Sequence, residues 1–255
     1  MPLPSPLRGC RTAIIFLTRI PVGGSAYRDN DWQWSTAWFP FIGFLIGLIL
    51  ALVCYLLAPL GPWVCAFTAI GLGMLITGGF HEDGLADTAD ALGGAYNREK
   101  LFVILKDSRI GAFGAMALCV SLGLRAALLA GLDQAAPQAL ILTESLSRLT
   151  PIWLMIFMPY VSSDEQAKSR QVARARWIHV LVATGLATMP CSILYMSGYL
   201  TVSSCAELVI AGLISGLVCG WRFHRRAGGI TGDFLGAVQQ ISQLAMLAVL
   251  LWPEH

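Results

Sequence analysis

The sequence predicts an all-α protein: a polytopic transmembrane helix bundle with about seven spans and a cytoplasmic N-terminus. Of its 255 residues, 56% are hydrophobic and only 13% are charged, whereas soluble domains carry about 25% charged residues. No Asp, Glu, Lys, Arg or His occurs from Trp32 to Phe80, a run long enough for two spans of ~20 residues. A chain of this length cannot bury so much apolar surface around one aqueous core, so lipid must act as part of its solvent.

The predicted spans are separated by two kinds of connection. Short connections with almost no positive charge lie near Pro59–Pro62, Asp133–Ala136 and Ser203–Cys205. Longer ones are the N-terminal segment and residues 81–110, 159–176 and 222–233. With no internal repeat, residues 1–255 form a single integral membrane domain in this interpretation. The seven apolar runs are 36–58, 63–80, 111–132, 137–158, 177–202, 206–221 and 234–252.

The distribution of positive charge predicts the orientation of the chain. All but two of the 17 Lys and Arg residues lie in the longer connections, and cytoplasmic loops carry an excess of Lys and Arg. The longer connections, and any active site built on them, are therefore expected to face the cytoplasm. The two exceptions, Arg125 and Arg148, lie inside apolar runs.

The loop after the second run contains closely spaced acids. If residues 83–92 are helical, Asp83, Asp87 and Asp90 lie within about 60° of one another around the helix axis. Like charges placed in this way repel one another and favour a bound cation. Oxygen ligands alone indicate Mg²⁺ or Mn²⁺. The alternative is a solvated acidic loop that merely follows a span.

Two further segments of the longer connections carry candidate phosphate ligands. Asp107 and Arg109 flank Ser108 just before the third run, and they form either a structural ion pair or a metal ligand beside a phosphate clamp. Gly228, Gly229, Thr231 and Asp233 follow two arginines, which suits a loop that wraps a phosphate. These arginines are equally explained by the positive-inside rule.

Arg148 is a candidate for a functional charge inside the membrane. Glu144 precedes it by one helical turn, so a pair that simply neutralises itself is the alternative. The seven cysteines have no metal-binding spacing, and no basic block indicates nucleic-acid binding. Acids for a metal combined with arginines and glycine loops for phosphate favour metal-assisted phosphoryl or nucleotidyl transfer.

At these residues the sequence resembles the bacterial cobalamin synthase family, the adenosylcobinamide-GDP ribazoletransferases. The similar segments occur in the family's order and cover nearly the whole chain. They are Thr18–Pro21, Gly78–His81, Asp83–Asp87 with Asp90, Asp107–Gly111, Ser147–Arg148, Gly228–Gly229, Thr231–Asp233 and Leu235–Ala237.

The resemblance implies a Mg²⁺-dependent, multi-pass enzyme of the cell inner membrane that acts at the end of vitamin B12 assembly. Its substrates would be adenosylcobinamide-GDP and α-ribazole or its 5′-phosphate, and its products adenosylcobalamin or its 5′-phosphate and GMP. Membrane lipid would surround it, nucleic acid would not be a partner, and a homo-oligomer stays open.

The resemblance also assigns roles to residues. Mg²⁺ would be held by four carboxylates, and phosphates would be bound by Ser108, by two arginines and by the glycine loop. His81 would be the general base, although on an ideal helix it points away from the acids. The residues concerned are Asp83, Asp87, Asp90 and Asp107 for the metal, and Ser108, Arg109, Arg148, Gly228, Gly229, Thr231 and Asp233 for substrate.

Some positions depart from the family, and two other functions are weighed against it. Glu82 stands where relatives often have an apolar residue, and Gln239, Gln240 and Gln243 stand in a span that tends to carry acids. The aspartate spacing is also similar to that of CDP-alcohol phosphotransferases, which act on lipids. A transporter is the third hypothesis, but the acids cluster at one membrane edge and not at the midplane.

Overall fold

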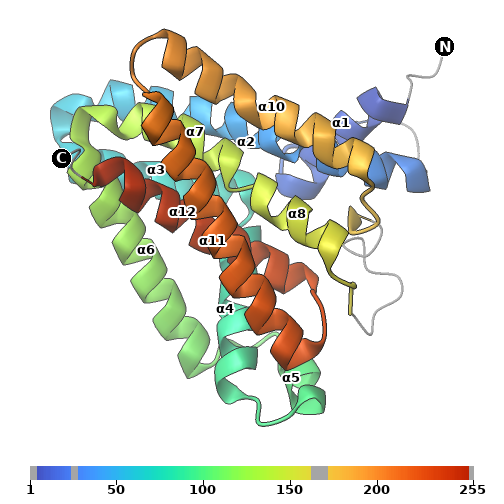
Figure 1. The fold of residues 1–255 in the computed structure, drawn as a ribbon. Coiled ribbons are helices and arrows are strands. Elements are labelled where there is room, and N and C mark those ends of the chain that lie inside the picture. The colour runs from blue at the N-terminus through green and yellow to red at the C-terminus, as the bar shows by residue number, and fades with distance from the viewer. Residues whose placement is uncertain (1–4, 24–27, 162–171, 253–255) are drawn as a thin grey trace.

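A computed structural model describes residues 5–23, 28–161 and 172–252. Within these ranges the chain is helical, and the only β-type pairing is a single bridge between Tyr160 and Ile230. The prediction of an all-α helix bundle is therefore confirmed (Figure 1). The helices are α1 Ser5–Leu17, α2 Asp29–Leu57, α3 Pro62–Thr77, α4 Phe80–Gly94, α5 Arg98–Ile104, α6 Ala112–Leu132, α7 Ala136–Leu146, α8 Leu149–Phe157, α10 Trp177–Met196, α11 Val202–Ala227 and α12 Gly232–Leu251, with short 3-10 helices at Ala58–Leu60 and Asp133–Ala135.

Five apolar segments of the described chain are long enough to cross a membrane, and the bent pair α3–α4 makes a sixth if it counts as one span. The chain is thus a multi-pass membrane protein, while seven spans and the orientation stay predictions. One segment, Ala112–Phe157, is 46 residues long and contains two of the predicted runs. In Figure 1, α7 leaves the 3-10 helix at Asp133–Ala135 in a different direction from α6.

Several predicted boundaries are wrong, because local capping ends or extends the helices. The second connection, 81–110, by contrast contains α4, which includes the helix predicted over residues 83–92, and α5. α11 continues to Ala227, where Gly228 (φ 78°) ends it, so the loop predicted from residue 222 is confined to 228–231. α10 stops at Met196 and not at residue 202. Of the predicted loop 159–176, residues 162–171 lie outside the described ranges.

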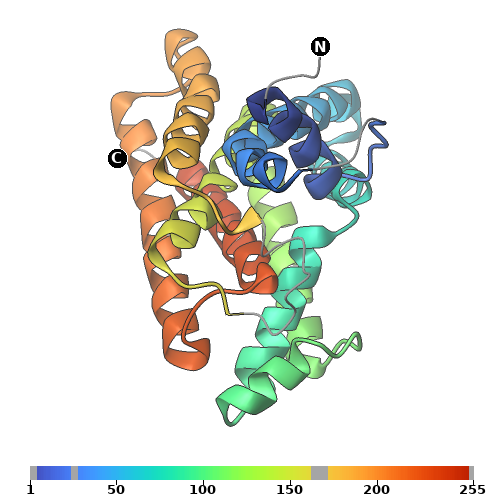
Figure 2. The ribbon, with the colours of Figure 1, turned by 90° about the vertical axis from the view of Figure 1, so that its right-hand side faces the viewer.

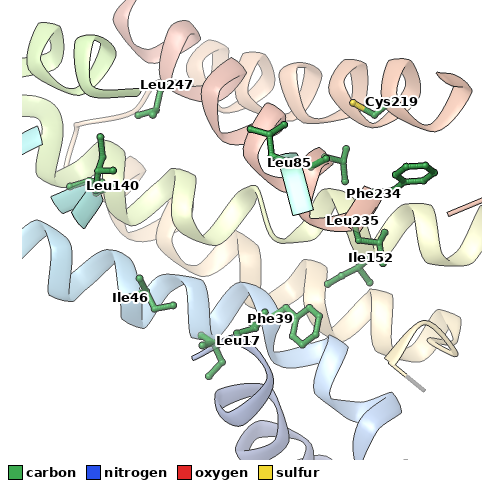
Figure 3. Packing of buried hydrophobic residues seen from close by; sticks show 14 of the residues in the cluster. Leu17, Phe39, Ile46, Leu85, Leu140, Ile152, Cys219, Phe234, Leu235 and Leu247 are labelled. Atoms are coloured by element: carbon green, nitrogen blue, oxygen red, sulfur yellow. The ribbon is translucent and has the colours of Figure 1, made fainter. Parts of the chain in front are cut away.

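The bundle is held together by close helix contacts and a largely apolar core. α2 packs on α1, α7 and α10. Two glycines of α2 permit its close contact with α7. A Cβ on Gly43 would collide with the Glu144 carbonyl, and one on Gly47 would lie 2.8 Å from the Cα of Ile141. Small residues allow membrane helices to approach in this way. Figure 3 shows Leu17, Phe39 and Ile46 of this layer facing the rest of the core.

The second layer places the acid-bearing helix at one end of the molecule. α12 packs on α4 and α11. In Figure 1, α4, α5 and the C-terminal end of α11 lie at the bottom, while the turn at Asp133–Ala135 and the C-terminus lie at the upper left. Figure 2, turned by 90°, again shows α4 and α5 at the bottom, away from α1 and α2. α4 turns away from α3 by 91°. Asp90 lies at the N-terminal end of α6, so we place the part of α4 from Asp87 onward at the membrane edge, outside the membrane-spanning segments.

Candidate functional site

The turn between α3 and α4 is made by two consecutive glycines. Gly78 (φ 72°) and Gly79 (φ 67°) both have left-handed backbone conformations, which residues with a Cβ atom rarely adopt. The Arg19 side chain fills the space beside Gly78, and the Arg19 N–H donates to the Ile76 carbonyl at 2.7 Å. Two of the segments that resemble the family therefore meet at this turn and fix the start of α4.

α4 approaches α12 almost backbone to backbone. A Cβ on Gly84 would lie 2.9 Å from the carbonyl oxygen of Asp233, and one on Gly236 would lie 3.4 Å from the Cα of Gly84. The predicted helix over residues 83–92 is confirmed as part of α4. Its close approach brings Asp83 and Asp87 toward Asp233 at the first turn of α12. These three carboxylates are called the acid face below.

The electrostatics of the acid face are those of crowded carboxylates. Burial first, and then the charges of Asp83, Asp233 and Asp90, raise the pKa of Asp87 to about 6. Its half-buried carboxyl group thus resists ionisation until a positive charge compensates the neighbouring acids. Asp83 is exposed, so the face opens to solvent. A divalent cation is the ligand that this donor set favours.

Asp90 belongs to a different environment. Its carboxylate accepts the backbone N–H of Gly111 at 2.7 Å and that of Gly114 at 2.8 Å. It is 9% exposed and satisfies free N–H groups at the N-terminus of α6. Asp90 lies close enough to Asp87 for its charge to raise the pKa of that group, but both its oxygens already accept N–H groups of α6, so its role as a metal ligand stays a prediction.

Asp107 and Arg109 form the ion pair that one of the two interpretations predicted. Arg109 donates from Nη2 and Nε to the two Asp107 oxygens at 2.7 and 2.9 Å. Hydrogen bonds from Arg109 hold the pKa of Asp107 down to about 2. The pair and Ser108 lie at the surface before α6. No described contact joins Asp107 to α4, so its role as a metal ligand stays a prediction.

The predicted metal ligands do not form a complete coordination site as they stand. Within residues 5–23, 28–161 and 172–252, no group of three or more His, Cys, Asp and Glu side chains is placed to hold an ion. The oxygen chemistry of the acid face nevertheless fits Mg²⁺. The residues able to contribute are Asp83, Asp87 and Asp233, and the last of these was expected to bind substrate.

The residues of the glycine loop make structural contacts with neighbouring segments. Gly228 caps α11, and a Cβ on Gly229 would collide with the Pro159 carbonyl. The Ile230 N–H donates to that carbonyl at 2.9 Å, and the Thr231 hydroxyl accepts the Phe234 N–H at the start of α12. These contacts explain the loop without a ligand, so phosphate binding by Gly228, Gly229 and Thr231 stays a prediction.

Arg148 is buried with Glu144, as the neutralising alternative predicted. Its Nη1 donates to a Glu144 carboxylate oxygen at 2.6 Å, and both side chains are 3% exposed. Arg125 donates to the other Glu144 oxygen at 2.7 Å and to Glu82 at 3.3 Å. Two cations and two anions thus balance one another inside the bundle, as buried charges require. Whether Arg148 also binds phosphate stays a prediction.

Three glutamines of α12 complete this buried polar cluster. Gln243 donates to Glu144 at 2.8 Å, Gln240 donates to Glu82 at 3.1 Å, and Gln239 donates to Ser147 at 2.8 Å. The cluster consists of Glu82, Arg125, Glu144, Arg148, Gln239, Gln240 and Gln243, and it joins α4, α6, α7 and α12.

His81 faces this cluster and not the acid face. It is 6% exposed and lines two hollows, an apolar one and a polar one, together with Arg148 and Gln239. The geometric expectation that it points away from the acids is confirmed, since Asp83 is exposed while His81 is buried. Its proposed role as general base therefore lacks a described contact with the acids.

Comparison with known proteins decides the family. The sequence model of the family described as cobalamin-5-phosphate synthase matches residues 9–251. The chain belongs to this family. Relatives named adenosylcobinamide-GDP ribazoletransferase include those of Leptothrix cholodnii (38% identity, 91% of this chain and 90% of the relative) and Shewanella woodyi (39%, 94% and 93%). That of Rhizobium etli is 39% identical over 93% of this chain and 94% of the relative. No solved structure matches.

Membership of the cobalamin-5-phosphate synthase family confirms the resemblance seen in the sequence. Sequence reasoning nevertheless missed the buried polar cluster, although Arg125, Glu82 and the glutamines were each noticed singly. The available signal was the spacing of Gln239, Gln240 and Gln243 within an apolar helix, because such amides need partners inside a membrane. It also missed the pairing of Asp233 with α4, which depends on tertiary packing.

Proposed function

We propose that the chain transfers the adenosylcobinamide phosphate group of adenosylcobinamide-GDP to α-ribazole or its 5′-phosphate, at the end of cobalamin assembly. Support comes from the family match over residues 9–251 and from the names of the relatives, which cover more than nine-tenths of the chain. The observation that carries the proposal is the acid face, which lies on two of the segments that resemble the family.

The reaction is a substitution at phosphorus. The ribose hydroxyl of α-ribazole attacks the phosphorus next to the aminopropanol arm of adenosylcobinamide-GDP. A new P–O bond forms, the bond from this phosphorus to the bridging oxygen breaks, and GMP leaves with the electron pair. The hydroxyl proton passes to solvent or to a nearby base.

The residues of the acid face fit a cofactor with two positive charges. Asp83, Asp87 and Asp233 would hold Mg²⁺, which would neutralise negative charge on the diphosphate and on the leaving group. Without the cation, the three carboxylates would repel the substrate. The chain itself supplies their positions, through the glycine contact of α4 with α12.

The direct test is turnover by the purified, full-length protein in detergent. Adenosylcobinamide-GDP and α-ribazole are supplied with Mg²⁺ or with EDTA, and GMP release is measured. Mg²⁺-dependent GMP release together with a new cobalamin product is expected. Release of CMP from a CDP-alcohol, with no GMP from adenosylcobinamide-GDP, would support the lipid phosphotransferase instead.

We also propose that the acid face lies on the cytoplasmic side of the inner membrane, as the distribution of Lys and Arg favours. The test is labelling of exposed single cysteines in intact cells with an impermeant maleimide. Ser108→Cys should be protected until the cells are opened, and Ser203→Cys should react from outside. Reaction in the reverse order would overturn the orientation.

A further inference from the structure

An apolar hollow lies between α1, α2, α4, α8 and α12, and three phenylalanines line it. It is called the aromatic pocket here. Phe16 stacks on Phe39 with ring centroids 5.6 Å apart, and it meets Phe80 edge to face at 5.2 Å. Phe39 is 5% exposed, whereas Phe80 is 38% exposed. In Figure 3, Phe39 and Leu17 lie on one side of this region and Leu235 on the other.

The inner end of the aromatic pocket is polar. His81, Arg148 and Gln239 line it, and the same three side chains line the polar hollow inside the buried polar cluster. The Arg148 Nε has no hydrogen-bond partner among the described residues, although the residue is 3% exposed. A buried guanidinium N–H without an acceptor is costly. An acceptor on a ligand that enters the aromatic pocket would satisfy this N–H.

The pocket opens beside the acid face. Gly232 and Gly236 line it, and Asp233 lies between them in the chain. His81 lines it from α4, whereas Asp83 lies on the opposite side of that helix. A ligand with a ring in the pocket and a sugar at its mouth would thus place that sugar near Asp233.

We infer that the aromatic pocket binds the flat heteroaromatic base of the ribazole substrate, with a ring nitrogen accepting from Arg148. This inference rests on the proposed function. Phenylalanine faces stack on bases, and a ring nitrogen that is not bonded to the sugar is an acceptor. The attacking ribose hydroxyl would then lie outside the pocket, on the side of Asp233.

The size of the pocket sets a condition on binding. It encloses about 440 Å³ of empty space, open space at its mouth included, but water-sized molecules can be centred in only about 30 Å³ of it. An aromatic base therefore enters only when side chains of the lining rearrange around it.

Steady-state kinetics of the full-length protein test this pocket with two substitutions. Phe80→Ala should raise the KM for α-ribazole at least about fivefold, the lower end of what one base–aromatic contact contributes. Met155→Trp, which fills the pocket from α8, should raise it similarly. The KM for adenosylcobinamide-GDP should stay within about twofold in both. Phe67→Ala is the matched control, because Phe67 is an exposed phenylalanine of α3 away from the pocket.

Equilibrium dialysis with α-ribazole alone separates this inference from the proposed function. Wild-type protein should bind α-ribazole, and Phe80→Ala should bind it at least fivefold more weakly. If the wild type turns over both substrates while the two pocket variants leave the KM for α-ribazole unchanged, the pocket assignment is overturned and the function stands. If the wild type binds α-ribazole in the pocket but releases no GMP, the proposed function fails instead.

Discussion

Asp90 of α4 and Gly111 at the start of α6 lie on either side of α5 in the sequence, and the carboxylate of Asp90 accepts the Gly111 N–H at 2.7 Å. A second hydrogen bond, from the Gly114 N–H, fixes the other carboxylate oxygen. Asp90 thus holds the N-terminus of α6 against α4. Its carboxylate is committed to this contact, and this distinguishes it from Asp87 one turn earlier.

Asp90→Asn should therefore destabilise the protein more than it impairs chemistry. An amide keeps one acceptor and loses the charge, and hydrogen bonds to charged groups contribute about 1.5–3 kcal/mol. We expect a lower free energy of unfolding, measured by SDS-induced unfolding in mixed micelles, with nearly unchanged Mg²⁺ dependence of turnover. A large loss of Mg²⁺ affinity at unchanged stability would instead make Asp90 a metal ligand.

Asp87→Asn should have the opposite effect. Removing a central carboxylate of the acid face should lower kcat at least about a hundredfold, because metal-ion charge stabilisation contributes several kcal/mol. Stability should be unchanged or slightly higher, since one of several crowded negative charges is gone. Turnover and thermal unfolding of the same preparation provide the measurement. Glu99→Gln, an exposed change on α5, is the control, and wild-type turnover by Asp87→Asn at limiting Mg²⁺ would refute the metal assignment.

The raised pKa of Asp87 predicts how metal binding depends on pH. A carboxyl group with a folded-state pKa of about 6 is protonated below that pH, and protons then compete with the cation. Apparent Mg²⁺ affinity should fall as pH drops through 6, by up to about tenfold per pH unit for one competing proton. In metal-free protein the folding stability changes in the opposite direction. It falls as pH rises from the pKa of Asp87 in the unfolded chain through 6, because the crowded carboxylate then ionises in the folded state. Calorimetric Mg²⁺ titration at pH 5, 6 and 7 measures the first effect, and Asp87→Asn should flatten it.

In the buried polar cluster, a second substitution at Glu82 should restore stability that is lost on substitution of Arg125. Arg125→Met leaves two carboxylates facing one cation, and breaking a buried pair costs about 3–5 kcal/mol. Arg125→Met combined with Glu82→Gln restores the charge balance and should recover most of the lost stability. Unfolding of both variants in detergent tests this. Equal stability of the single and double variants would show that the ion pair of these two side chains contributes little.

Substitution of Arg109, in the surface ion pair before α6, should affect substrate binding and not stability. Arg109 is fully exposed beside Asp107, so Arg109→Ala should leave the melting temperature unchanged. If Arg109 binds a substrate phosphate, the KM for adenosylcobinamide-GDP should rise about tenfold, the contribution of one charge-assisted hydrogen bond. Lys106→Ala, another exposed cation nearby, is the comparison. An equal effect of both changes would indicate general attraction of a negative substrate and not a specific clamp.

Much of this arrangement could be predicted from the sequence, because lipid imposes simple rules. The lack of charge from Trp32 to Phe80 required membrane helices, and the spacing of Asp83 and Asp87 predicted their common face on α4. Helix ends were harder to predict. α11 passes beyond Trp221 to Ala227, because arginines continue a helix as readily as apolar residues do.

The part of the site that could not be predicted depends on contacts between distant segments. Nothing in the local sequence of Asp90 shows that the free N–H groups of α6 will occupy its oxygens. Nor does the sequence of α12 show that Asp233 will approach α4. Arg125 was ambiguous alone, since its partners Glu82 and Glu144 come from two other helices.

The contact of Gly84 with Asp233 and Gly236 has a consequence for how the family can vary. Because main chain meets main chain there, the separation between the carboxylates of α4 and that of α12 is set by the peptide backbone. Lipid-facing residues around these helices can then change among relatives without altering the distance between the carboxylates. A single methyl group at position 84 would force the two helices apart and would change the separation of Asp233 from both Asp83 and Asp87.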